Sequence, residues 1–461
     1  MIYIYFLLLV YIIIKMSVLG FPEELNFQSL KSMYPSRKQE YRKAPMNSQS
    51  FSNAGQDIQL VLSKMENTWY DPATLCVNFT VDYNGVSAGT VNVDGTFILG
   101  YAYSHFSRQV VRPISGQPIE TIDNPSLLGN AVLNMTMDTL EKLSLSTTLG
   151  FNAIETFSNL GALIENANYA VSQSYSLPLI GCLNCAKLIP GFITDIEIDL
   201  TLNSLSNFIS SVTTLANSNP TSFTIRNVEL VCEAITLEDS GMQQLLAAFP
   251  GAFKLKSQSY LYGSSSLPSA AGIGTYDITY SHSLNSLKQF IWWSSPSNAW
   301  ELNYAGVNPN CDSWQLLIGS TAYPQQLVKS SRPSECFMQN QKAFGSLYST
   351  SHSGSATKFN FAKASTAQGE YFAYNQKPAN FAGYQAESNS NKWYQALDLE
   401  IINSLKETLY TGISTKGSTN TLRLNIGRTL ATYQCHAIHF YSCFDIILEF
   451  DYANQMIDVI Q

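Results

Sequence analysis

The stretch that decides the fold is Tyr175–Leu202, which reads YSLPLIGCLNCAKLIPGFITDIEIDLTL. Its first part is predicted to be an ordered loop, because Pro178 and Pro190 restrict the backbone at its two ends. Its second part alternates strictly, with apolar residues at positions 196, 198, 200 and 202 and polar residues between them. Such a period places the apolar side chains on one face of a strand and the polar ones on the other. The stretch therefore predicts a half-buried antiparallel strand of a β-sandwich.

The composition of the whole chain favours an all-β protein with two domains. Its 461 residues exceed the ~250–300 at which a single hydrophobic core stops growing. Charged residues make up 13% of the chain, about half of the usual ~25%. The deficit is filled by Ser, Asn, Thr, Gln and Tyr, and a weakly charged, Tyr-rich surface suits contact with other proteins. An ordinary secreted β-rich protein has the same composition, so composition alone does not decide between the two.

The local patterns place a domain boundary near residue 250. In the first half, Asp94-Gly95 between extended runs predicts a hairpin, and Phe151–Ile164 has the apolar spacing of a helix. A strand is expected over Phe223–Leu237, followed by a helix over Met242–Phe249 that Pro250-Gly251 ends. The second half repeats this plan. A helix is expected at Glu335–Gly345, with Phe337, Met338 and Phe344 on its apolar side. Strands are expected at Phe253–Tyr262, Thr275–Tyr280, Phe290–Trp293, Trp314–Ile318, Tyr394–Ile401, Thr421–Ile426 and Phe440–Tyr452.

Two segments precede the first expected domain. Residues 1–15 form an apolar leader shorter than the ~20 residues that a membrane-spanning helix needs. We interpret it as an extension outside the mature protein, which would start at Met16, with a signal or anchor as the alternative. Residues 16–54 are expected to form a flexible arm, and its candidate phosphate-contacting residues are Lys31, Arg37, Lys38, Arg42 and Lys43.

The charge distribution supports a separate role for that arm. Residues 1–43 hold six basic and three acidic residues, which leaves 20 basic and 31 acidic residues in the rest of the chain. An acidic body argues against nucleic-acid binding by the folded domains. A basic arm of this length is also common as a leader without a partner, so the charge pattern leaves both interpretations open.

The sequence contains little that indicates catalysis or metal binding. Its eight cysteines are scattered, which favours free thiols over a disulfide framework. Cys182 and Cys185 form one C-x-x-C without a second pair, and His436 and His439 would lie on opposite faces of a strand. The paired carboxylates Glu197 and Asp199 are expected on a solvated or interface face. We expect no catalytic residues, no metal and no cofactor.

Several passages resemble the double-jelly-roll major capsid proteins of polinton-like elements, adintoviruses and virophages, which share the architecture of adenovirus hexon. The first is the quoted stretch, with its LPL and LIP punctuation before the alternating strand. The others are Trp314–Leu347 with Gly319 and Pro324 followed by a helix, Trp393–Ile413 with Glu400 and Gly412, and the closing strand with Phe444-Asp445. The resemblance covers roughly residues 55–461 and lies in patterns spread along the chain.

The resemblance implies an all-β fold of two consecutive jelly-roll β-sandwich domains, 55–250 and 251–461, with short helices inserted in the loops. It implies a structural capsid protein that is not an enzyme and that forms pseudo-hexagonal homotrimeric capsomers in an icosahedral shell. Neighbouring capsomers, penton and minor capsid proteins would be its partners, and the arm would contact packaged DNA or an internal membrane. Its place would be the virion, after assembly in the host cytoplasm or nucleus.

The alternative is a secreted β-sandwich binding protein or carbohydrate-active protein. Such a protein would use the leader as a signal and would oxidise its cysteines. Free thiols favour the capsid interpretation and paired cysteines the secreted one.

Overall fold

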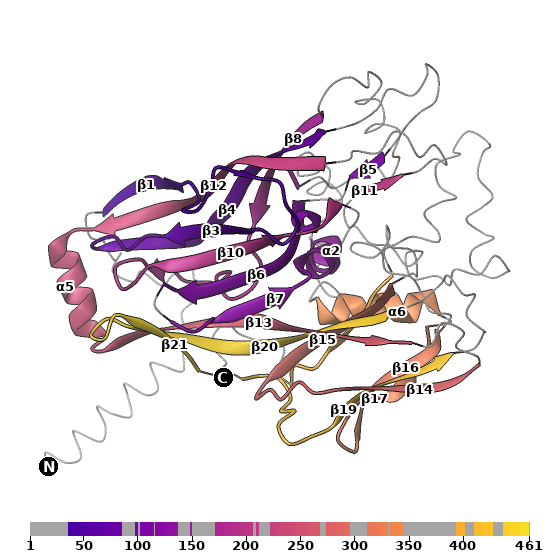
Figure 1. Ribbon diagram of the computed structural model, residues 1–461. Coiled ribbons are helices and arrows are strands. Elements are labelled where there is room, and N and C mark those ends of the chain that lie inside the picture. The colour runs from indigo at the N-terminus through magenta and orange to yellow at the C-terminus, as the bar shows by residue number, and fades with distance from the viewer. Residues whose placement is uncertain are drawn as a thin grey trace, which may run out of the picture.

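The structure, a computed structural model, consists mainly of β-strands in the part of the chain that it describes (Figure 1). It describes residues 36–84, 97–99, 102–114, 116–136, 148–149, 171–205, 209–211, 222–267, 273–295, 311–330, 332–344, 393–401, 410–426 and 437–460. Every pairing between the strands described is antiparallel.

The first half of the chain forms two main sheets. In spatial order, one contains β1 (Ser36–Lys43), β12 (Ser222–Leu237), β4 (Thr68–Asn84) and β8 (Val171–Pro178), with β2 (Ser50–Phe51) on β12 and β9 (Ile189–Pro190) on β4. The other contains β3 (Asp57–Leu62), β10 (Ile196–Leu202), β6 (Phe106–Pro113) and β7 (Glu120–Asp123). A separate ribbon pairs β5 (Phe97–Leu99) with β11 (Ile209–Ser211).

The second half also forms two sheets. One contains β13 (Ala252–Ser266), β20 (Ala437–Asp451), β15 (Leu287–Ser295) and β18 (Gln395–Asp398), with β21 (Met456–Ile460) on β20. The other contains β14 (Gly274–Tyr280), β19 (Asn420–Ile426), β16 (Cys311–Ile318) and β17 (Thr321–Val328).

The two halves have the same topology. If the strands on the two main paths of each half are counted along the chain, one sheet has the order first, eighth, third, sixth in both halves. The facing sheet has the order second, seventh, fourth, fifth in both. Two antiparallel sheets connected in this way form a jelly roll. The predicted fold of two consecutive jelly rolls is confirmed.

Helices occupy the loops of both rolls. After a 3-10 turn at Ala102–His105, helix α2 (Pro125–Thr136) follows the fifth strand of the first roll, and α6 (Pro333–Ala343) follows the fifth strand of the second. Each begins with proline. Proline suits the first turn because an N–H at that position would have no partner within the helix. Helix α5 (Asp239–Ala248) connects the rolls, close to the helix expected over Met242–Phe249.

Most of the expected strands are present. Strand β10 coincides with the alternating stretch at Ile196–Leu202, and β12 contains the expected strand at Phe223–Leu237. One prediction for α6 is wrong: Met338 is 43% exposed, and the buried residue of that turn is Cys336. The hairpin turn at Asp94-Gly95 and the helix at Phe151–Ile164 lie outside the described residues.

Aromatic side chains fill the core of the second roll. Trp292 packs edge-on against Trp393 and Trp314, with ring centroids 4.9 and 5.6 Å away. Its neighbour Trp293 is buried on the opposite face of β15, against Tyr441 and His439. Both tryptophans of the pair therefore serve packing, as edge-to-face aromatic contacts do in cores.

The two rolls pack against each other along one edge. In Figure 1, β7 of the first roll runs beside β13 of the second. Near α5, the Phe253 ring lies 5.2 Å from Trp69 and 5.9 Å from Phe192. Farther along, the Tyr441 hydroxyl donates to the carbonyl of Asp123 at 2.7 Å. The junction is therefore apolar at one end and hydrogen-bonded along its length.

Candidate functional site

The basic residues expected in a flexible arm lie mostly in an ordered strand. Arg37, Lys38, Arg42 and Lys43 belong to β1, which pairs with β12 from Ser36 to Lys43. The expectation of a flexible arm is therefore wrong for residues 36–43. Lys31 lies outside the described residues.

An aromatic anchor explains why this polar segment is ordered. The Tyr41 hydroxyl donates to the carbonyl of Val61 at 2.7 Å and accepts from the N–H of Ser63 at 3.0 Å. Its ring packs edge-on against Tyr70, 5.1 Å away. Tyr41 thus links β1 to the facing sheet, and burial raises its pKa.

Ion pairs with β12 compensate part of the basic charge. Lys38 pairs with Glu233, and Arg42 pairs with Glu229 at 3.3 Å and with Glu40 at 2.9 Å. The equal spacing of Lys38/Arg42 and Glu229/Glu233 was a sequence signal for this pairing. Arg37 is exposed, and the described part of the chain contains no ion pair of its guanidinium.

The carboxylates of β10, expected on a solvated or interface face, are buried within the chain. Glu197 and Asp199 are only 5% and 8% exposed. Arg112 on β6 lies between them, with its Nε 3.0 Å from Glu197 and its Nη2 2.9 Å from Asp199. Burial, followed by the charge of Glu197, raises the pKa of Asp199. Strand β10 is therefore buried on both faces, because a cross-strand guanidinium compensates the carboxylate charge.

The cysteines and histidines do not form a reactive or metal-binding cluster among the described residues. Seven cysteines are described, and all seven are free thiols, as expected. Burial raises the pKa of Cys232, Cys336 and Cys443 to about 12, which keeps them protonated and poorly reactive. His439 is half-buried beside Tyr262, whereas His436 lies outside the described residues. No group of His, Cys, Asp and Glu suited to a metal ion occurs in the described ranges.

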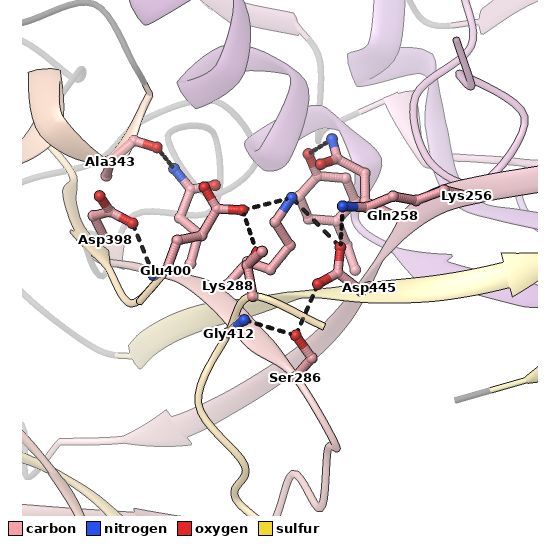
Figure 2. A network of polar contacts seen from close by, with 12 residues as sticks. Lys256, Gln258, Ser286, Lys288, Ala343, Asp398, Glu400, Gly412 and Asp445 are labelled. Carbon is pink, nitrogen blue, oxygen red and sulfur yellow. Dashed lines mark hydrogen bonds and ion pairs between the residues drawn. The ribbon is translucent and has the colours of Figure 1, made fainter. Parts of the chain in front are cut away.

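The residues that carried the capsid resemblance near the C-terminus meet in one polar network (Figure 2). Lys288 on β15 lies 2.9 Å from Glu400 and 3.5 Å from Asp445 on β20. The Ser286 hydroxyl donates to Asp445 at 2.8 Å and accepts from the N–H of Gly412 at 2.9 Å. Glu400, Gly412 and Asp445, which carry the resemblance in the sequence, therefore belong to one hydrogen-bonded and ion-paired network.

Gly412 has a steric reason for its identity. A Cβ at this position would collide with the backbone of Leu287, against which the glycine packs. The backbones of Leu287 and Ile413 exchange hydrogen bonds of 2.8 and 2.9 Å at the same place. The network therefore fixes the segment after β18 against β15.

A cavity of about 280 Å³ lies beside this network, between the rolls. It is lined by Val132 and Thr136 of α2 and, from the second roll, by residues that include Lys288, Asp398 and Glu400. Burial, followed by the charge of Glu400, raises the pKa of Asp398. Because the Glu400 carboxylate is held by Lys288, this arrangement stabilises the second roll more readily than it supplies an acid and a base to a substrate.

A second polar centre, which the sequence did not reveal, lies on the junction itself. The Glu120 carboxylate of β7 accepts from the N–H of Cys182 at 2.9 Å and from the Ser259 hydroxyl of β13 at 2.6 Å. The Ser257 hydroxyl, also on β13, donates to the carbonyl of Cys182 at 2.6 Å. The loop that begins the quoted stretch is thus hydrogen-bonded to both rolls. Glu120 stands 62 residues from Cys182 and 139 from Ser259, so no local pattern marks it.

Among the residues that the structure describes, no helix has the length and apolar character needed to cross a bilayer. This finding does not extend to the apolar leader, which lies outside those residues.

Comparison with known proteins places the fold. No protein-family model matches the sequence, and no curated protein matches it either. Among solved structures, the chain is similar to the Sputnik virophage cryo-EM structure with 11% identity and a TM-score of 0.57, covering 96% of this chain and 92% of that one. The capsid of PBCV-1 gives 12% identity and a TM-score of 0.57, with 94% and 99% covered. The mavirus major capsid protein gives 11% and 0.53, with 96% and 95% covered.

These likenesses extend over nearly the whole of each chain, through both jelly rolls. Sequence identities of 11–12% carry information about fold alone. The described topology and the comparisons agree that this chain has the double-jelly-roll fold found in viral major capsid proteins.

Proposed function

We propose that this protein is a viral major capsid protein whose place is the virion. The observation that carries the proposal is the joining of two rolls of identical strand order into one chain, along the full length of known capsid chains. Because the rolls have the same topology, three subunits arranged around a threefold axis would present six similar units. Such a capsomer is pseudo-hexagonal and can tile an icosahedral shell.

The homotrimer is the first testable part of this proposal. Specific protein interfaces bury about 1,600 Å² in total, and a permanent capsomer should exceed that value. Light scattering of the purified protein at micromolar concentration should give about three times the subunit mass of 51.1 kDa, and negative-stain images should show threefold particles with a hexagonal outline. A monomer at that concentration would contradict the proposal.

We further propose that neighbouring capsomers, penton and minor capsid proteins are its partners in the shell, and that assembly occurs in the host cytoplasm or nucleus. The secreted alternative gains no support from the thiols, since the seven described cysteines are free. Alkylation of the denatured, unreduced protein followed by mass analysis separates the two interpretations. Alkylated cysteines are expected, and paired ones would favour secretion.

Contact of the basic segment with packaged DNA or an internal membrane also remains a proposal. If all five candidate residues met phosphate, the slope of log affinity against log salt would be about −4 to −5. Because Lys38 and Arg42 are ion-paired on β1, we expect a shallower slope. Filter binding of the wild type and of Arg37→Ser at two salt concentrations tests the DNA version. Equal binding by both proteins would remove Arg37 from that role.

A further inference from the structure

The junction between the two jelly rolls contains a buried carboxyl group that has no cation beside it among the described residues. Glu120 is 3% exposed, and no salt bridge of its carboxylate occurs within the described residues. Its hydrogen-bond donors are all uncharged: the N–H and the thiol of Cys182, the hydroxyl of Ser259 and the N–H of Tyr260. A carboxylate stripped of water and without a counter-ion is costly to bury, so its neutral form is favoured.

The loop from Leu179 to Leu188 fixes this arrangement from a third side. Gln109 of β6 donates to the carbonyl of Ile180 at 2.6 Å, which ties the loop to the first roll. Gly181 adopts a φ of +102°, and a Cβ there would collide with the Glu120 carboxylate. The backbone of the loop is therefore packed directly on the acid, which leaves no room for a hydrating water on that side.

The titratable groups around Glu120 supply no positive charge. Cys182 of the loop and Tyr260 of β13 have pKa values that burial raises well above the usual range. Around Tyr260, burial likewise raises the pKa of Tyr103 and of Cys443 on β20. All four are neutral at physiological pH. Ser259 can donate to a carboxylate or accept from a carboxylic acid, so its contact with Glu120 survives protonation.

We propose that Glu120 makes the junction of the two rolls a proton-dependent clamp, tight when the carboxyl group is protonated and weaker when it is ionised. The clamp consists of Glu120 on β7, the backbone of Cys182 and the hydroxyls of Ser257 and Ser259 on β13. The proton binds to the Glu120 carboxyl group, and the two states of the clamp differ in the charge of this one buried group.

The direction of the pH dependence follows from the position of the group. Burial raises the pKa of Glu120 from 4.5 to about 7. A carboxyl group with a raised pKa in the folded state stabilises that state at low pH, and the stabilisation is lost as pH rises through the folded pKa. Opening of the junction should become about five- to sevenfold more favourable per pH unit between pH 5 and 7, and should level off above that window.

Hydrogen exchange on the full chain tests this directly. Exchange of peptides covering the 179–188 loop and Ser257–Tyr260 is measured from pH 5 to 8 and corrected for the intrinsic rate. Peptides from β16 and β19, which lie in the other sheet of the second roll, are the internal reference. The wild type should lose about fortyfold of protection at the junction from pH 5 to 7, relative to the reference.

Two variants assign the effect to Glu120. Glu120→Gln keeps the shape and cannot ionise, so its junction protection should be independent of pH in this window. Glu66→Gln changes an exposed glutamate and should behave as the wild type. Wild-type junction protection that does not change with pH overturns the proposal, even if Glu120→Gln fails to fold. A pH dependence that persists in folded Glu120→Gln overturns it as well.

Discussion

Two carboxyl groups in this protein are buried to the same extent in opposite surroundings. Glu120 is 3% exposed and Asp445 is 2% exposed. Asp445 faces the ammonium groups of Lys288 at 3.5 Å and Lys256 at 3.9 Å, besides the Ser286 hydroxyl. Glu120 has hydrogen-bond donors of no net charge. Two carboxyl groups with the same burial therefore differ in electrostatic surroundings, and the position of the nearest cation makes the difference.

The difference also separates two ways of joining segments. The Asp445 network joins strands and a loop within the second roll, and it contains ion pairs to Lys288. The Glu120 centre joins one roll to the other, where the loss of a single proton changes the contact. One centre therefore holds its carboxyl groups with a shared cation, and the other holds its carboxyl group with uncharged donors alone.

The largest effect is expected from removing a cation of the Asp445 network. Lys288→Met leaves the buried Asp445 and the partly buried Glu400 without their shared ammonium, and removing one partner of a buried pair costs about 3–5 kcal/mol. Urea unfolding of both proteins gives the difference in free energy. Lys254→Met is the matched control, since Lys254 is 58% exposed in its pair with Glu449, and should cost less than about 1 kcal/mol. Equal losses in both variants would show that Asp445 does not need its cation.

His439 should give a pH dependence of the opposite sign to that of Glu120. Burial lowers its pKa to about 4, so the neutral ring stabilises the folded state above the unfolded pKa of 6.5. That stabilisation, at most about 3 kcal/mol, is lost as pH falls from 6.5 towards 4. The free energy of unfolding is measured for the wild type and for His439→Gln from pH 7 to 4. The difference between the two proteins should decrease as the pH is lowered. A constant difference would contradict this prediction.

A smaller loss is expected from crowding the Glu120 centre. Gly181→Ala places a methyl group against the Glu120 carboxyl, whereas Gly251→Ala has open space around it. Both glycines have a φ of +102°, so the pair separates collision from backbone strain. We expect Gly181→Ala to cost about 2 kcal/mol more than Gly251→Ala in chemical unfolding. Equal costs would mean that the loop can move away from Glu120.

The smallest effect concerns the ion pairs of β1. Lys38→Ala removes the partner of Glu233 at the surface, and exposed pairs contribute about 0–1 kcal/mol. The melting temperature should change little and the change should shrink further in high salt. Tyr41→Phe, which removes two hydrogen bonds of the anchor, should lower it more. The reverse order would show that charge rather than the tyrosine anchor holds β1 in the sheet.

Local patterns in the sequence predicted single elements well and their partners poorly. The alternation over Ile196–Leu202 specified β10 because a strand exposes two faces of different polarity. It did not reveal that Arg112, 85 residues away, would allow Glu197 to be buried. The basic charge of residues 36–43 favours an arm, but Tyr41 binds Val61 of β3 and the segment forms β1. No local pattern marks Glu120 either, because all its partners come from distant parts of the chain.

Strands β12 and β20 have a consequence for the order in which the protein folds. Each is the eighth strand of its roll along the chain, yet each lies inside its sheet: β12 pairs with β1, β2 and β4, and β20 with β13, β15 and β21. During synthesis from the N-terminus, β1 and β4 can be joined in one sheet only after residues 222–237 have been made, because β12 lies between them. Contacts this distant in sequence make folding slow and leave strand edges open in the meantime. Nascent chains that end between rolls should therefore be the first that can form a complete sandwich.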